Sequence, residues 1–284
     1  MIRFVGLMLV AVAAEALALD LRDDRGVTIS LGRPAERIVA LAPHLAEMTF
    51  AAGGGAKLVG VSSFSRHPAE AERLPIVATA GRIDIERLVA LRPDLVLGWK
   101  SGNSPLQLNQ LEHIGIPVFV TEVRSFADIP RIVRAIGALA DSVKLAEARA
   151  RGFEMEVERL RERYASRRPV AVFLEIWHRP MLTVSGSHLI SDALGLCGGR
   201  NVFAAAKTLT PLVSREQILE ARPEAIVTAG FGADTFSTWK GFQSVPAVRD
   251  RRVFAIDPDA LHAQGPHVLA GVRALCEGLD RARS

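Results

Sequence analysis

Histidine and tryptophan side chains are the groups in this sequence that are best suited to chemistry. Six of the seven histidines and all three tryptophans lie in or beside the segments that connect apolar runs: His44, His67, His178, His188, His262, His267, Trp99, Trp177 and Trp239. A neutral imidazole can ligate iron, cobalt, zinc or nickel. Aromatic faces beside a few polar donors suit a large, mostly apolar molecule. These residue types therefore favour the binding of a small molecule or a metal chelate.

Motifs for enzymatic chemistry are missing from the sequence. It contains no CxxC or HExxH pattern, and the Ser-Gly-Ser-His segment at 185–188 lacks the flanking glycines of a nucleophile elbow. The glycines at 53–55 follow a predicted helix, whereas a phosphate-binding loop precedes one. We therefore expect a binding protein without catalytic residues and without a resident metal or cofactor.

Short apolar runs alternate with helical segments along the chain. The first half predicts strands at 37–42, 57–62, 94–99 and 117–122 and helices at 45–52, 84–91 and 105–114. The second half predicts strands at 169–176 and 224–228 and helices at 188–196 and 217–221. Such alternation is typical of an α/β fold with central parallel sheets.

One stretch of the sequence occurs twice. ERLVALRPDLVLG, which begins at Glu86, aligns with EQILEARPEAIVTAG, which begins at Glu216. Both contain a glutamate, a helical turn, Arg-Pro, an acidic residue, an apolar strand and a glycine. Because internal repeats constrain the fold before other features, we predict a duplicated lobe.

A charged helical segment separates the two halves, with helices predicted at 129–139 and 143–166. The second has apolar residues at spacings of three and four: Ala146, Ala150, Phe153, Val157 and Leu160. One long helix is a stiff connector. We therefore predict two Rossmann-like lobes with a ligand cleft between them, joined by this backbone helix. The predicted limits are 19–125 for the N-terminal lobe, 126–167 for the connecting helical segment and 168–284 for the C-terminal lobe.

Composition and the first residues indicate an exported globular protein. Of the 284 residues, 49% are hydrophobic and 23% charged, and a net charge of +4 without a basic block does not favour nucleic-acid binding. Arg3, the apolar run at 4–14 and Ala16-Leu17-Ala18 predict a signal peptide at 1–18 that is cleaved near Ala18. The run is too short to span a membrane.

Cys197 and Cys276 are the only cysteines of the chain. Two cysteines in an exported protein favour one disulfide bond. Two buried free thiols are the alternative.

Five segments carry a family resemblance: RIVALAPHLAEMTFAAG, VGVSSFSRHP, ERLVALRPDLVLGW, VSREQILEARPEAIV and LCGGRNVF. Together they resemble the helical-backbone solute-binding proteins of ABC importers, and most of all the cobalamin-binding members. The resemblance extends from about Arg37 to Cys276. It implies a monomeric periplasmic protein that captures a corrinoid, either cobalamin or cobinamide, and delivers it to the permease subunits of an inner-membrane ABC importer.

The resemblance also implies roles for two exposed acids. In that family a glutamate on each lobe docks onto arginines of the permease, and Glu86 and Glu216 match those positions. Each begins a predicted helix, where the helix dipole favours a carboxylate. Helix capping alone is the alternative role.

Several ligand contacts carry over in the same way. Trp99 matches a cleft tryptophan, and Phe64 stands where the cobalamin-binding members have a tyrosine. Asp259 matches a ligand-contacting aspartate, and His262 an adjacent contact. The remaining predicted ligand-binding residues lie on expected cleft loops: His44, Trp177, His178 and Trp239. Core packing is the alternative for a single tryptophan.

Three departures from the family pattern widen the choice of ligand. Ala80, Thr210 and Ala260 stand where the cobalamin-binding members have tryptophans, which implies another corrinoid, such as cobinamide, or another ligand. Haem or a different metal chelate held by His44, His178 or His262 is the alternative. The only tyrosine, Tyr164, falls on the connector helix, so we exclude a tyrosinate-ligated haem in the cleft.

Overall fold

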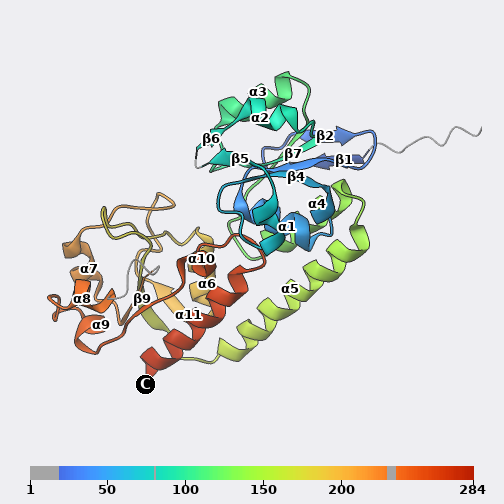
Figure 1. Ribbon diagram of the computed structural model, residues 1–284. Coiled ribbons are helices and arrows are strands. Elements are labelled where there is room, and N and C mark those ends of the chain that lie inside the picture. The colour runs from blue at the N-terminus through green and yellow to red at the C-terminus, as the bar shows by residue number, and fades with distance from the viewer. Residues whose placement is uncertain (1–18, 80, 229–234) are drawn as a thin grey trace, which may run out of the picture.

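Two α/β lobes stand side by side and a long helix runs along both of them (Figure 1). This computed structural model describes residues 19–79, 81–228 and 235–284. The predicted signal peptide at 1–18, Ala80 and the segment at 229–234 lie outside the described residues. Within the described ranges, no helix combines the length and the apolar character that a membrane span requires.

The N-terminal lobe is built on a six-stranded sheet in the order β6-β5-β4-β3-β7-β8. Its strands are β3 (Ile38–Ala40), β4 (Leu58–Ser62), β5 (Ile76–Thr79), β6 (Arg82–Ile83), β7 (Leu95–Trp99) and β8 (Val118–Thr121). All neighbours pair in parallel except β5 and β6. The connecting helices are α1 (Pro43–Ala51), α2 (Ile85–Ala90) and α3 (Pro105–His113), with short turns η1 (Gly55–Lys57) and η2 (Ala69–Arg73). A separate antiparallel hairpin joins β1 (Leu19–Arg22) to β2 (Thr28–Leu31).

The C-terminal lobe has a smaller, fully parallel sheet in the order β10-β9-β11-β12. Its strands are β9 (Val170–Glu175), β10 (Gly199–Asn201), β11 (Ala225–Thr228) and β12 (Val253–Ala255). Its helices are α6 (Leu189–Leu196), α7 (Arg215–Ala221), α8 (Thr235–Trp239), α9 (Pro246–Arg249), α10 (Pro258–Leu261) and α11 (Val268–Arg283). The predicted disulfide is confirmed, because Cys197 after α6 is bonded to Cys276 in α11.

The sequence repeat has the same local geometry in both lobes. Arg92 after α2 and Arg222 after α7 have φ angles of 47° and 46°, in the left-handed region that turns each helix into its strand. The following acids hold the first residues of a neighbouring strand. Asp94 accepts the backbone N–H of Arg37 at 2.8 Å, and Glu224 accepts that of Ala171 at 3.2 Å. These matched turns support the duplication of a lobe.

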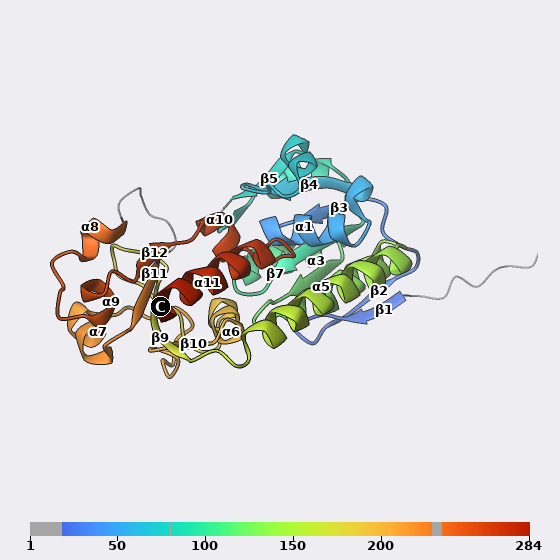
Figure 2. The ribbon, with the colours of Figure 1, turned by 90° about the horizontal axis from the view of Figure 1, so that it is seen from below.

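The connector consists of α4 (Asp128–Leu139) and α5 (Val143–Tyr164), which pack against each other. All five apolar residues of the predicted stripe on α5 are buried. Figure 2 shows α5 reaching from the N-terminal lobe to the start of the C-terminal sheet. The predicted backbone helix is therefore confirmed, and it is continuous through 22 residues.

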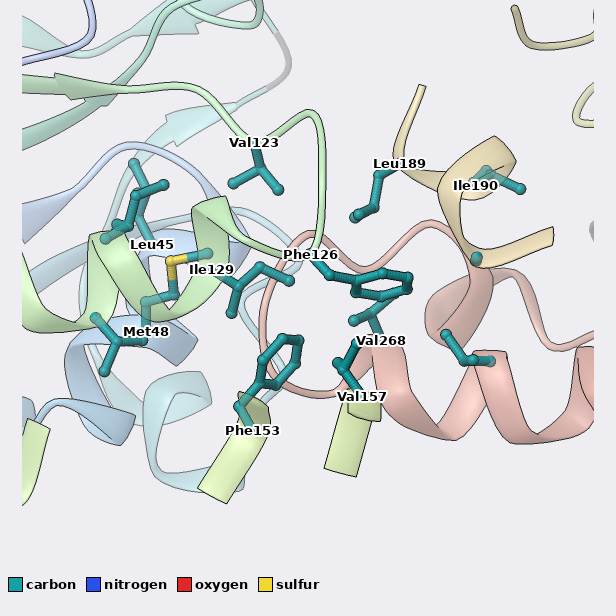
Figure 3. Packing of buried hydrophobic residues seen from close by; sticks show 14 of the residues in the cluster. Leu45, Met48, Val123, Phe126, Ile129, Phe153, Val157, Leu189, Ile190 and Val268 are labelled. Atoms are coloured by element: carbon teal, nitrogen blue, oxygen red, sulfur yellow. The ribbon is translucent and has the colours of Figure 1, made fainter. Parts of the chain in front are cut away.

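One hydrophobic core extends through both lobes and the connector. Figure 3 shows Phe126 among Val157 of α5, Leu189 of α6 and Val268 of α11. The ring of Phe126 also lies 6.2 Å from that of Phe153, measured between centroids. Because close-packed interiors resist deformation, this shared core opposes movement of one lobe against the other.

Each strand and helix predicted from the sequence is present, with ends shifted by no more than two residues. Six short strands were not predicted from the apolar runs, and the first two of them form the hairpin: β1, β2, β5, β6, β10 and β12. None exceeds four residues, and polar or charged residues interrupt the apolar run in β1 (LDLR), β2 (TISL), β6 (RI) and β10 (GRN).

Candidate functional site

A pocket of about 310 Å³ opens between the two lobes. The N-terminal lobe lines it with Pro43, His44, Glu47, Phe64, Arg66, His67 and Trp99, and the C-terminal lobe with Pro258, Asp259, His262, Ala263 and Gln264. These residues lie at or after the carboxyl ends of β3, β4, β7 and β12, where parallel strands place binding loops. The structure thus brings together five predicted ligand-binding residues: His44, Phe64, Trp99, Asp259 and His262.

His44 and Trp99 form one wall of the pocket. The imidazole lies edge-on to the indole, with 5.2 Å between the ring centroids. His44 is only 7% exposed, and burial lowers its pKa to about 3, so the ring is neutral at pH 7. Its Nε2 and the Trp99 Nε1 have no hydrogen-bond partner in the described part of the chain. An unpaired buried polar atom is costly, so either nitrogen could pair with a ligand once its ring turns toward the pocket.

The Gly-Asn pair after Trp99 holds its indole in place. The Asn103 side-chain oxygen accepts the Trp99 backbone N–H at 2.7 Å, and the Asn103 amide donates to the Leu41 carbonyl at 3.2 Å. A Cβ atom at Gly102 would lie 1.8 Å from the Trp99 ring, so only glycine allows this packing.

The mouth of the pocket is bridged from lobe to lobe. Arg66 Nη1 lies 2.9 Å from Asp259 Oδ2, and its guanidinium carbon is 5.5 Å from the Phe64 ring centroid. Phe64 is 70% exposed and has a φ of 65°, so the chain holds an aromatic ring at the rim in a conformation that favours glycine. His67 and His267 stack across the same boundary, 4.1 Å apart.

Glu47 is a pocket residue that the sequence analysis missed. Its Oε1 accepts the backbone N–H of His267 at 2.5 Å, which ties α1 to the C-terminal lobe. Burial raises the pKa of Glu47 to about 7, and the His267 N–H partly opposes that shift. The spacing from His44 could have identified it, because residues three apart share one face of a helix. Arg66 was also missed, since its partner Asp259 is 193 residues away.

Three predicted ligand-binding residues do not line this pocket: Trp177, His178 and Trp239. The prediction for Trp239 is wrong, because its indole is 1% exposed and packs against Phe173 in the core. Its Nε1 donates to Glu175 Oε2 at 2.9 Å, and His178 Nδ1 lies 2.5 Å from Glu175 Oε1. Trp177 is 48% exposed and donates its Nε1–H to the Arg179 carbonyl.

The two predicted docking glutamates lie in equivalent places. Glu86 is exposed in the first turn of α2, and Glu216 is exposed in the first turn of α7. The helices are capped by other residues, Asp84 and Ser214, whose side chains accept backbone N–H groups. Capping therefore does not require either glutamate.

The remaining sequence expectations concern metals and the departures from the family. Within the described ranges, no group of three or more histidine, cysteine or acidic side chains is arranged to hold a metal ion. Tyr164 is 3% exposed on α5, away from the pocket lining, as predicted. Thr210 is exposed and Ala260 is buried, while Ala80 lies outside the described residues.

Comparisons with known proteins agree with this architecture. The family model for periplasmic binding proteins matches residues 38–260. The vitamin B12-binding protein of Vibrio cholerae is 34% identical over 251 residues, covering 88% of this chain and 91% of its own length. That of Yersinia pestis is 36% identical over 246 residues, covering 86% of each protein.

Solved structures give the same result. The crystal structure of the periplasmic vitamin B12 binding protein of Vibrio cholerae matches with a TM-score of 0.82 and 33% identity, over 88% of this chain and 99% of that one. A periplasmic heme binding protein from Pseudomonas aeruginosa matches with a TM-score of 0.75 and 26% identity, over 85% and 91%. With two lobes, a backbone helix and a pocket between them, this chain belongs to the periplasmic binding protein family.

Proposed function

We propose that this protein captures a corrinoid, cobalamin or cobinamide, in the periplasm and delivers it to an inner-membrane ABC importer. Relatives that match almost the whole chain at 34–36% identity are vitamin B12-binding proteins. The corrinoid is cargo and not a cofactor, and no bond is made or broken. Phe64, Trp99, Asp259 and His262 are the proposed contacts, and His44 joins them because its Nε2 is unpaired beside the pocket.

The pocket between the lobes is the observation that carries this proposal. A corrin is a large, mostly apolar disc with amide groups around its edge. Trp99 and Phe64 offer aromatic surface to the disc, while Arg66, Asp259 and Gln264 offer polar groups to its edge. The shared core holds the lobes in fixed positions, so little ordering is needed when the ligand enters.

Titration of the purified protein with cyanocobalamin, dicyanocobinamide and haemin tests the proposal. Tryptophan fluorescence and the visible spectrum report binding. We expect saturable, stoichiometric binding of a corrinoid. Stronger binding of cobinamide than of cobalamin would be explained by the loss of the family's tryptophans at Ala80, Thr210 and Ala260. Absence of corrinoid binding would refute the proposal.

Haem is the second candidate, because His44 presents a neutral imidazole with an unpaired Nε2. His262 lies in the same pocket, whereas His178 is hydrogen-bonded to Glu175 outside the lining. A haemin complex with a shifted Soret band that His44→Ala abolishes would favour this candidate. The matched control is His113→Ala, which changes an exposed histidine on α3.

We also propose that Glu86 and Glu216 dock the loaded protein onto the permease. Members of this family deliver a small-molecule ligand to an ABC transporter, and the two glutamates lie exposed at equivalent positions of the lobes. Glu86 also borders a surface groove of about 660 Å³ that a partner side chain can enter. Exposed charges of this kind determine orientation and association rate more than affinity.

Charge reversal at both glutamates tests the docking role. Glu86→Arg with Glu216→Arg is expected to leave corrinoid affinity unchanged and to stop uptake by cells that depend on this protein. Glu162→Arg with Glu277→Arg makes the same change in net charge at two exposed positions on α5 and α11. Normal uptake with the first pair, or equal loss with both pairs, would contradict specific docking.

The proposal includes a cleaved signal peptide, the boundaries of the two lobes and a monomeric state. Residues 1–18 would direct the chain to the periplasm and be cleaved near Ala18, which leaves a protein that begins with β1. The lobes would extend over 19–125 and 168–284, with 126–167 as the connector, and the protein would act as a monomer. N-terminal sequencing of the exported protein and its mass in solution test these limits.

A further inference from the structure

The charges around the pocket are nearly balanced before any ligand arrives. Arg66 is the only arginine or lysine among the described residues that line it. Asp259 from the opposite lobe already pairs with that guanidinium at 2.9 Å. Each side chain is about half exposed, so this ion pair lies at the mouth, where the edge of a ligand enters.

A further carboxyl group, that of Glu47, is partly ionised at pH 7, because burial raises its pKa to about 7. Glu47 lies in the lining and is held by the His267 N–H. Burial lowers the pKa of both His44 and His262, so neither imidazole carries a positive charge at pH 7. Arg66, the one guanidinium or ammonium group of the described lining, is thus already paired, and the lining offers two carboxyl groups to hydrogen-bond donors.

From these contacts we propose that the Arg66–Asp259 pair and Glu47 select a macrocycle edged by neutral amides over the same macrocycle edged by carboxylates. This selectivity rests on the proposed corrinoid function. An amide has both a donor and an acceptor, so its NH₂ can bond to Asp259 or Glu47 while its oxygen accepts from Arg66. A carboxylate would lose hydration beside Asp259 and the partly ionised Glu47 without gaining an unpaired guanidinium, which is a repulsive form of specificity.

Asp259 is the residue whose change should alter selectivity most. Asp259→Asn keeps the shape of the side chain but leaves Arg66 as an unpaired cation at the mouth. An unpaired guanidinium is well suited to bind a carboxylate. Arg66→Gln has the opposite consequence, because it removes the cation and leaves both acids.

Two ligands with the same ring and the same cobalt test the inference directly. Dicyanocobinamide carries amides, and dicyanocobyrinic acid carries carboxylates in their place. Wild-type protein at low salt is expected to prefer cobinamide by about tenfold or more, the scale of one repulsive charge contact. Asp259→Asn should reduce the ratio of cobinamide affinity to cobyrinic acid affinity by about tenfold, and Arg66→Gln should increase that ratio. Fluorescence titration gives each dissociation constant.

A matched control separates this effect from a general change in charge. Asp250→Asn also releases arginines from an exposed carboxylate, here Arg249 and Arg252, and it follows α9, outside the pocket lining. It should leave the ratio unchanged. Circular dichroism confirms folding of each variant, and because Arg66 and Asp259 are half exposed, both variants are expected to fold.

The outcomes distinguish the two proposals. If wild-type protein binds cobinamide and cobyrinic acid equally, or if Asp259→Asn shifts the ratio no more than Asp250→Asn does, the selectivity inference is overturned and the corrinoid function stands. If the protein binds haemin and neither corrinoid, the proposed function itself fails, and the inference fails with it.

Discussion

One histidine–tryptophan pair in each lobe has the opposite hydrogen-bonding state. In the N-terminal lobe, the ring nitrogens His44 Nε2 and Trp99 Nε1 lie beside the pocket without a hydrogen-bond partner in the described chain. In the C-terminal lobe, His178 and Trp239 both bond to the buried carboxylate of Glu175. The proposed function assigns the N-terminal pair to the ligand, whereas the C-terminal pair stabilises its own lobe.

Replacement of Trp239 should have the largest effect, and the effect should be on stability. Trp239→Ala removes a fully buried ring and leaves Glu175 without an indole donor, so we expect a loss of about 3–5 kcal/mol in the free energy of unfolding. Denaturant titration measures it. The folded protein should bind ligand as wild type does. A selective loss of affinity would show that Trp239 belongs to the site after all.

Replacement of Trp99 should affect ligand binding instead. Trp99→Ala removes an aromatic face from the pocket wall and should weaken corrinoid binding by about 1–3 kcal/mol. Fluorescence of the remaining tryptophans or calorimetry gives the dissociation constant. If Trp177→Ala weakened corrinoid binding more than Trp99→Ala did, the main ligand-binding tryptophan would be in the C-terminal lobe.

His188 should make the smallest contribution, and that contribution depends on pH. Its Nδ1 caps α6 by accepting the Ile190 N–H at 3.1 Å, and burial, with a smaller effect of His262, lowers its pKa to about 4. The cap is complete above pH 6.5, the ordinary value for histidine, and is lost as the pH falls through 4, because the native state resists protonation.

We therefore expect His188→Ala to cost about 1 kcal/mol at pH 7, the usual value of a helix cap. His188→Asn can cap without titrating, so its stability should fall less than that of wild type between pH 7 and 5. Unfolding experiments at both pH values measure this difference, with His113→Asn as the control for an exposed histidine. Glu47, with its raised pKa, contributes the opposite slope in wild type and variants alike. Equal slopes for wild type and His188→Asn would contradict the capping role.

The sequence predicted the architecture well because its signals are local. The Arg-Pro turn before β7 and β11, the apolar stripe of α5 and the glutamates at the starts of α2 and α7 all depend on neighbours within a few residues. The two-residue strand β6 escaped the same analysis because its pairing with β5, rather than an apolar run, makes it a strand.

The site was predicted only in part. His44, Phe64, Trp99, Asp259 and His262 do line one pocket, because strand ends place their loops at the same edge. Trp239 was misassigned because a tryptophan in a loop has the same local signature whether it faces solvent, ligand or core. Trp239 ends α8, and its burial depends on Phe173 and Glu175 of β9.

From the sequence alone, the repeated α/β pattern and the long helix could be predicted, and a disulfide was favoured over two free thiols. The structure was needed to form that bond, to show which ring nitrogens are buried without a partner beside the pocket, and to bring Arg66 to Asp259. The physical reason is distance along the chain. Helical and strand periodicity is a property of neighbouring residues, whereas burial, pairing and charge balance arise where segments nearly 200 residues apart pack together.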